Sequence, residues 1–266
     1  MVGVASNISA LTALTQLQRN QKDLSQAMQR LATGKKINSG KDDPAGLIAV
    51  QLLRRYISAA RVEQKIVKRA EASANITEGQ MGELSGMMNE LRSLTIAAAN
   101  SGAFSNAEIA ANQMQADYLV NSIQTFGNAA LRSLEKFNMG GDGNAKVRTQ
   151  IQDAMAQAAT LASNGSNSLT SGNFDGAEAA LDSATTAVAT ARAHIGAYQR
   201  YKLGPRLRMA ETAEINLEAS RSRIEDADFA VEVSNMIRAQ ILTDVSIKVL
   251  AIANQQGRNI LALLGG

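Results

Sequence analysis

Residues 228–256 read DFAVEVSNMIRAQILTDVSIKVLAIANQQ, and this stretch decides the fold. It contains no glycine or proline. Its large apolar residues recur every three or four positions, at Phe229, Val233, Met236, Ile237, Ile241, Val245, Val249 and Ile252. That spacing places them on one face of an α-helix. We therefore expect a long amphipathic helix near the end of the chain.

A similar pattern opens the chain. No glycine or proline occurs between Val4 and Thr33. Apolar residues again follow helical spacing, at Val4, Ile8, Leu11, Leu14, Leu17, Leu24, Met28 and Leu31. Each terminal helix would be about 40–45 Å long. An isolated amphipathic helix is marginal in water, because helices gain most of their stability by burying an apolar face. We expect the two ends to pair as coiled-coil helices.

A pair of helices still leaves apolar surface uncovered, and the uncharged ending NILALLGG adds more of it. Large exposed apolar patches usually mark interaction surfaces. Identical copies that meet head to tail without closing a ring form an open helical filament. We therefore predict a homopolymer. The positions expected to pack in it are Ile8, Leu11, Leu14, Leu17, Leu24, Met28, Leu31, Val233, Met236, Ile237, Ile241, Val245, Val249, Ile252, Ile260, Leu261 and Leu264.

Composition favours an all-α fold. Hydrophobic residues make up 45% of the chain, yet aromatic residues make up only 3%, and there are two prolines. Strand-forming aromatics are therefore scarce, whereas good helix formers are common. Between the terminal helices, helical patterns alternate with glycine-rich breaks. We predict a long helical rod bundle here.

The breaks suggest five segments. They are an N-terminal helix (1–33), a connector (34–46), a rod (47–220, with a variable centre at 137–176), a second connector (221–228) and a C-terminal helix (229–266).

Local signals predict where helices begin and end. Asp43 before Pro44 is typical of an N-cap followed by proline at the first helical position. Ser222 followed by Glu225 matches a capping box that would open the last helix. Gly204 and Pro205 predict a kink or short break. The serine- and asparagine-rich stretch 163–173 is expected to be the most exposed point.

Several function classes find no support. The net charge is +3 with both signs interspersed, so no basic stripe suggests nucleic acid. The absence of cysteine excludes disulfides, thiol catalysis and thiolate metal sites. The only histidine, His194, is expected to be structural, and helix capping accounts for Asp42 and Asp43. We predict no enzyme, no cofactor and no metal site.

Membrane and secretory signals are also missing from the sequence. No run of about 18 apolar residues suggests a membrane-spanning helix. The N-terminus has no basic residue before Arg19 and no apolar core of signal-peptide length. If the protein leaves the cell, we expect a route other than a secretory signal peptide.

Both ends of the chain resemble bacterial flagellin. LATGKKINSGKDDPAG (31–46) is similar to the family's N-terminal motif, as is SRIEDADFAVEVSNMIRAQILTDV (222–245) to its C-terminal region. N-terminal matching positions are Arg30, Leu31, Gly34, Ile37, Asn38, Ser39, Lys41, Asp42, Asp43, Ala45 and Gly46. At the C-terminal end, the matches include Ser222 to Asp226, Ala239 to Leu242, Ala251 and Ala253 to Gln255.

The resemblance implies a secreted, extracellular filament subunit for motility, exported through the flagellar type III apparatus. It implies an export chaperone, a filament cap and hook-junction proteins as partners, and terminal helices that form an inner tube. It places Asp42, Asp43, Glu225 and Asp226 in the connectors. Where the family often carries a short β-hairpin, TFGNAALRSLEKF (125–137) favours continued helix.

Two alternatives remain open. The hook–filament junction protein of the same superfamily shares the terminal helices, but its resemblance is weaker at SRIEDADFAVEVSNM (222–236). A membrane-active amphipathic protein would also have apolar ends. Such helices usually carry a basic polar face, whereas only Lys248 and Arg258 are basic after Arg238.

Overall fold

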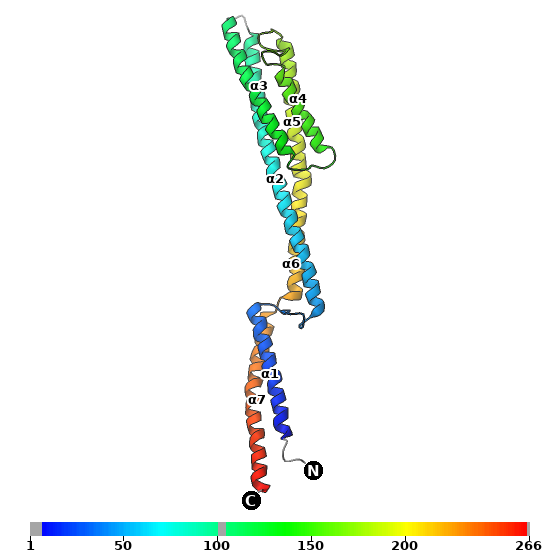
Figure 1. Cartoon of the computed structure of the whole chain (residues 1–266), viewed down its shortest axis with the longest axis vertical. Coiled ribbons are helices and arrows are strands. Elements are labelled where there is room, and N and C mark those ends of the chain that lie inside the picture. Colours follow the sequence, from blue (N-terminus) through cyan, green and yellow to red (C-terminus); the bar gives the residue numbers. More distant parts are fainter. Residues whose placement is uncertain (1–6, 101–104, 265–266) are drawn as a thin grey trace. The chain divides into compact units, whose positions relative to one another are not determined.

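The computed structural model describes residues 7–100 and 105–264, with the side chains of 257–264 excepted. Within these residues the chain forms α1 (Ile8–Thr33), α2 (Pro44–Ala99), α3 (Asn106–Leu134), α4 (Gly143–Ala159), α5 (Phe174–Tyr198), the π-helical segment η2 (Gln199–Leu203), α6 (Gly204–Glu225) and α7 (Phe229–Leu264) (Figure 1). No strand occurs in this part of the chain, which holds a single isolated bridge between Lys35 and Asp226. The all-α prediction is confirmed.

Most of the residues where a β-hairpin was considered are helical, and 135–137 form a turn. Residues 125–134 belong to α3, which runs unbroken to Leu134. Gly127 lies inside this helix, where an added Cβ would collide with the Met155 side chain of α4. Glycine therefore serves close helix packing at this position, and the prediction of continued helix over a hairpin is confirmed.

The chain divides into two compact units. One comprises residues 1–59 and 213–266, and the other comprises residues 60–212. The second unit is a bundle in which α2 runs antiparallel to α5, with α3 and α4 alongside. Arg192 pairs with Glu78 at 2.8 Å, and Gln199 donates a hydrogen bond to Asn75 at 2.7 Å. Its core includes the fully buried Met81, Leu91, Ile123, Leu181 and Ile195.

A kink or short break was expected at Gly204 and Pro205, but the helical backbone continues through both residues. The Gly204 N–H bonds to the carbonyl of Gln199, five residues back, so the chain forms a π-helical turn before α6. Proline has no N–H and its ring crowds the carbonyl four residues earlier in a regular α-helix. Across this wider turn the buried residues Tyr198 and Leu203 are five positions apart, one more than the four of a regular α-helix.

The loop between α4 and α5 is packed rather than fully exposed. Ser168 and Leu169 are only 4% and 1% exposed. The Gln113 side chain, on α3, donates to the carbonyl of Leu161 at 3.0 Å and accepts from the Leu169 amide at 2.6 Å. The expectation for 163–173 is therefore wrong for these two residues. Composition pointed to exposure, but a buried glutamine satisfies the loop's backbone.

One of the two predicted helix starts is correct. The Asp43 carboxylate accepts a hydrogen bond from the Gly46 amide at 2.9 Å, and α2 begins at Pro44. Ser222 lies inside α6 and opens no helix. The cap of α7 is Asp228, which accepts from the amides of Ala230 and Val231. The capping-box prediction is wrong, because Ser222 to Glu225 continue α6 and an aspartate closer to the helix competes successfully for the cap.

Candidate functional site

The paired terminal helices α1 and α7 form the first candidate site. They lie side by side and antiparallel in Figure 1. Asn7, which precedes α1, donates to the carbonyl of Ala253 at 2.7 Å. At the other end of α1, Arg30 pairs with Glu232 at 2.9 Å. Residues early in α1 therefore meet residues late in α7.

The seam between α1 and α7 is built from small and polar residues. All but one of the buried residues of the pair follow each other seven residues apart: Ala13, Asn20 and Ala27 on α1, and Glu232, Ala239, Ser246 and Ala253 on α7, with Thr243 of α7 as the exception. Seven residues are close to two helical turns, so each set forms one line along its helix. Small side chains let two helix backbones approach closely. The spacing of the large apolar residues alone does not reveal this line, although its seven-residue period is visible in the sequence.

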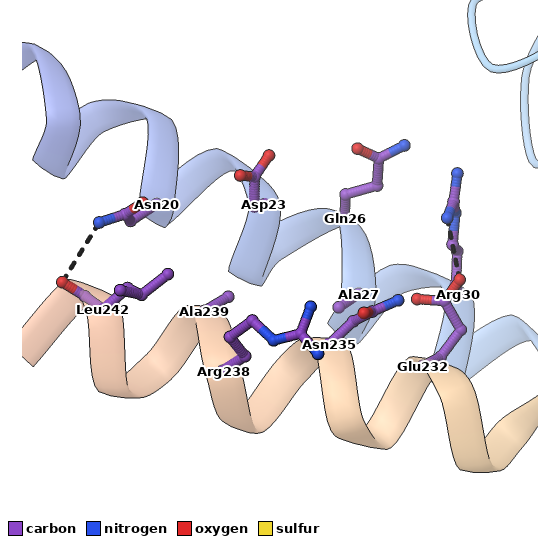
Figure 2. Close-up of a pocket in the computed structure, with 10 residues that line it drawn as sticks. All are labelled: Asn20, Asp23, Gln26, Ala27, Arg30, Glu232, Asn235, Arg238, Ala239 and Leu242. Atoms are coloured by element: carbon purple, nitrogen blue, oxygen red, sulfur yellow. Dashed lines mark hydrogen bonds and ion pairs between the residues drawn. The ribbon is translucent and has the colours of Figure 1, made fainter.

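Polar contacts cross the seam. Asn20 donates to the Ser246 hydroxyl at 2.8 Å and to the carbonyl of Leu242 at 3.2 Å. Figure 2 shows Asn20 reaching across to Leu242, and Arg30 meeting Glu232 further along the same groove. Because Asp23, Arg30, Glu232 and Arg238 line this groove, its charges are balanced.

The predicted packing residues fall into two groups. Five are half-buried: Leu17, Leu24, Leu31, Val233 and Met236. Nine are exposed: Ile8, Leu11, Leu14, Met28, Ile237, Ile241, Val245, Val249 and Ile252. Ile260, Leu261 and Leu264 lie in the helical backbone of α7, but their side chains are outside the described residues, as is Val4.

Most of the large apolar side chains are thus left uncovered by the pair. Exposure in the group of nine ranges from 40% at Leu14 to 68% at Ile8. Further exposed apolar side chains that the sequence analysis did not assign to packing are Phe229, Val231, Leu242 and Ile247. Apolar surface of this extent is typical of an interaction site. We call the nine residues the exposed apolar face.

The connectors form the second candidate site, centred on Glu225. The Glu225 side chain is only 4% exposed, and its carboxylate contacts Lys35 at 2.7 Å and Arg54 at 2.5 Å. Arg221 approaches within 3.6 Å. The Glu225 carbonyl accepts from the Lys36 amide at 2.7 Å. One residue thereby links the end of α6, the 34–43 segment and the start of α2.

The surroundings of Glu225 favour its ionised form. Burial by itself raises the pKa of this carboxyl, but the hydrogen bond from Lys35 and the positive charge of Arg54 outweigh burial, so the pKa lies below its usual value. Removing either cation would leave a buried charge with less compensation, which is costly.

The other connector acids have local roles. Asp42 accepts hydrogen bonds from the amides of Asn38 and Ser39, and these bonds lower the pKa of its carboxyl. Asp42 therefore closes a turn and caps no helix, contrary to expectation, whereas Asp43 is the N-cap of α2. The backbone of Asp226 forms the isolated bridge with Lys35.

Metal-binding and membrane-spanning features are absent from the described residues. In the described part of the chain, no group of three or more His, Asp or Glu side chains is placed to hold a metal ion. Across the same residues, no helix is sufficiently long and apolar to cross a membrane. The two regions provide an exposed apolar surface and a buried carboxylate held by two cations.

Comparisons with known proteins agree on one family. The bacterial flagellin N-terminal helical region matches residues 4–131, and the bacterial flagellin C-terminal helical region matches residues 179–264. The flagellar filament 30.7 kDa core protein of Treponema maltophilum is 28% identical, over 97% of this chain and 98% of its own length. Flagellin of Bacillus subtilis is 27% identical over the same shares. Helical termini, an exposed apolar face and these two matches lead to one conclusion: the chain belongs to the bacterial flagellin family.

Proposed function

We propose that this flagellin polymerises by burying the exposed apolar face of α1 and α7 against neighbouring copies. As a flagellin it is a structural subunit of the bacterial flagellar filament, which is extracellular. The family is structural and not enzymatic. The observation that carries the proposal is the exposure of nine large apolar side chains on a pair whose buried seam uses mainly small and polar ones.

The energetics favour such an assembly. A large apolar side chain gains about 1.5–3 kcal/mol when it is fully buried. Side chains that are already about half covered would gain about 1 kcal/mol each. The nine would together contribute roughly 10 kcal/mol per copy, before the entropy cost of association is subtracted. In a homopolymer this contribution recurs for every subunit.

We assign roles to the five segments in the same way. Residues 1–33 and 229–266 would drive assembly, 34–46 and 221–228 would act as connectors, and 47–220 would form the rod. The ion pair between Glu225 and Lys35 supports the connector role, because it joins a residue of each connector. Glu225 also pairs with Arg54, at the start of the rod segment. Ile260, Leu261 and Leu264 would extend the apolar surface along α7.

Family membership supports three further kinds of partner. We propose an export chaperone, a filament cap and hook-junction proteins as partners, and export through the flagellar type III apparatus. Each is testable by deleting the corresponding gene in the native cell and assaying secreted flagellin.

Seeded growth tests the proposed interface. The double variant Ile241→Ser/Val245→Ser removes two members of the exposed apolar face, which are 57% and 48% exposed. It should add to filament seeds far more slowly than wild type, as seen by negative-stain microscopy, while its thermal unfolding changes little. Lys248→Ser is the matched control, since Lys248 is exposed on the same helix but is not apolar. Equal growth of all three chains would refute the proposed interface.

A further inference from the structure

The seam of the α1–α7 pair repeats itself so regularly that its register needs an explanation. Buried small or polar residues recur every seven positions on both helices, at 13, 20 and 27 on one and at 232, 239, 246 and 253 on the other. Leucines at 17, 24 and 31 repeat with the same period. If α7 slid by seven residues along α1, most small residues would again face small ones.

The observed contacts define the native register. Asn20 contacts Ser246. In an antiparallel pair with this spacing, one heptad further along α1 meets one heptad earlier on α7, so Ala27 lies opposite Ala239. A slip of one heptad moves the helices by about 10.5 Å and places Asn20 opposite Ala239 or Ala253. The alanines in these lines do not distinguish the arrangements.

Asn20 distinguishes them by hydrogen bonding. It is only 4% exposed. Its bond to the Leu242 carbonyl uses the backbone, and an equivalent carbonyl lies opposite it in any heptad register. Its bond to the Ser246 hydroxyl at 2.8 Å is specific, because the residues seven positions away from Ser246 are alanines. A slipped pair leaves buried hydrogen-bonding capacity unused, which is unfavourable.

Two other polar links cross the pair nearer its ends. Asn7 bonds to a backbone carbonyl, that of Ala253, which has an equivalent one heptad away. Arg30 pairs with Glu232 near one end of the pair, and their side chains are 23% and 9% exposed, so this ion pair is largely buried and also resists a slip. Asn20 is the buried link in the middle.

We propose that Asn20, through Ser246, sets the register in the middle of the α1–α7 pair. A single buried asparagine is known to fix coiled-coil alignment at a cost in stability. The register in turn decides which residues form the exposed apolar face on the outside of the pair. The inference goes beyond the proposed function, since it concerns which residues of one chain face each other and not whether copies polymerise.

Paired cysteines can read the register directly, because the natural chain contains no cysteine. Ala27→Cys with Ala239→Cys reports the native register. Leu24→Cys with Leu250→Cys, and Leu24→Cys with Met236→Cys, report slips of one heptad in either direction. A disulfide needs Cα atoms within about 7 Å, so each pair closes in only one register. Each pair is placed in the full chain, assembled with excess wild-type chain, oxidised and read as intrachain product.

Asn20→Ala keeps a small residue in the seam and removes the link. We expect the ratio of slipped to native disulfide to rise about five- to thirty-fold, the range for loss of one buried hydrogen bond. Ser246→Ala should give the same shift, and the two changes together should add little. Asn254→Ala, an exposed asparagine on α7, is the matched control and should leave the ratio unchanged.

Two results would overturn the inference. One is native disulfide at full yield in both Asn20→Ala and Ser246→Ala. The other is loss of all three disulfides, or failure of the variants to enter filaments, which would mean that Asn20 is needed for pairing itself. Every sample contains excess wild-type chain, which drives filament growth. A sample of wild-type chain alone therefore shows separately whether polymerisation itself has failed.

Discussion

Replacing Glu225 with glutamine should loosen the connectors without unfolding the rod. Cutting one partner out of a buried ion pair costs about 3–5 kcal/mol when both charges are buried. Here Lys35 and Arg54 are 42% and 41% exposed and can be rehydrated, and glutamine keeps the shape and an acceptor oxygen. We therefore expect a loss of about 1–2 kcal/mol.

The local effect can be read by amide hydrogen exchange in the full chain. The Lys36 amide bonds to the carbonyl of Glu225, and the Ala227 amide bonds to the carbonyl of Gly34. Exchange at both amides should accelerate about five- to thirty-fold in Glu225→Gln. Glu211→Gln is the control, since Glu211 lies on the same helix and forms no salt bridge among the described residues. Equal exchange in wild type and Glu225→Gln would refute the reasoning.

Three further predictions follow from other parts of the molecule. Because the pKa of Glu225 is lowered in the fold, its contribution is present above the usual glutamate pKa of about 4.3 and is lost as pH falls through the folded value. Exchange at Lys36, corrected for intrinsic rates, should therefore accelerate in acid in wild type but much less in Glu225→Gln. Truncation after Gly257 removes apolar residues that each contribute about 1.5–3 kcal/mol when buried. Seeded growth should therefore fail, while the thermal unfolding temperature of the rod should not change. Gln113→Ala leaves the Leu169 amide without its partner, so that amide should exchange faster while amides of the α2 core do not.

The helices could be predicted from the sequence because their periodicity is local. Stretches without glycine or proline and with apolar residues three or four apart became α1 and α7, and Asp43 with Pro44 marked the start of α2. Errors arose where two local signals competed. The spacing of Ser222 and Glu225 predicted a cap, but both residues belong to α6, and Asp228 caps α7 instead.

The site was less predictable, because its contacts join distant parts of the chain. The resemblance placed Glu225 in a connector. No spacing rule predicts its contacts with Lys35 and Arg54, because Arg54, for example, is 171 residues away in the sequence. The seam of α1 and α7 was missed for another reason. Burial was assigned to large apolar residues, whereas close antiparallel packing selects small ones and leaves many of the large ones outside.

The most direct test of the account measures whether the exposed apolar face becomes buried on assembly. Ile241→Cys introduces one thiol into a chain that has none, at a position 57% exposed in the single copy. The account predicts fast reaction with a bulky maleimide in the monomer and strong protection in intact filaments. Lys248→Cys, on the same helix, shows whether protection is selective for the apolar face. Labelling of Ile241→Cys in filaments at the monomer rate would contradict the central claim.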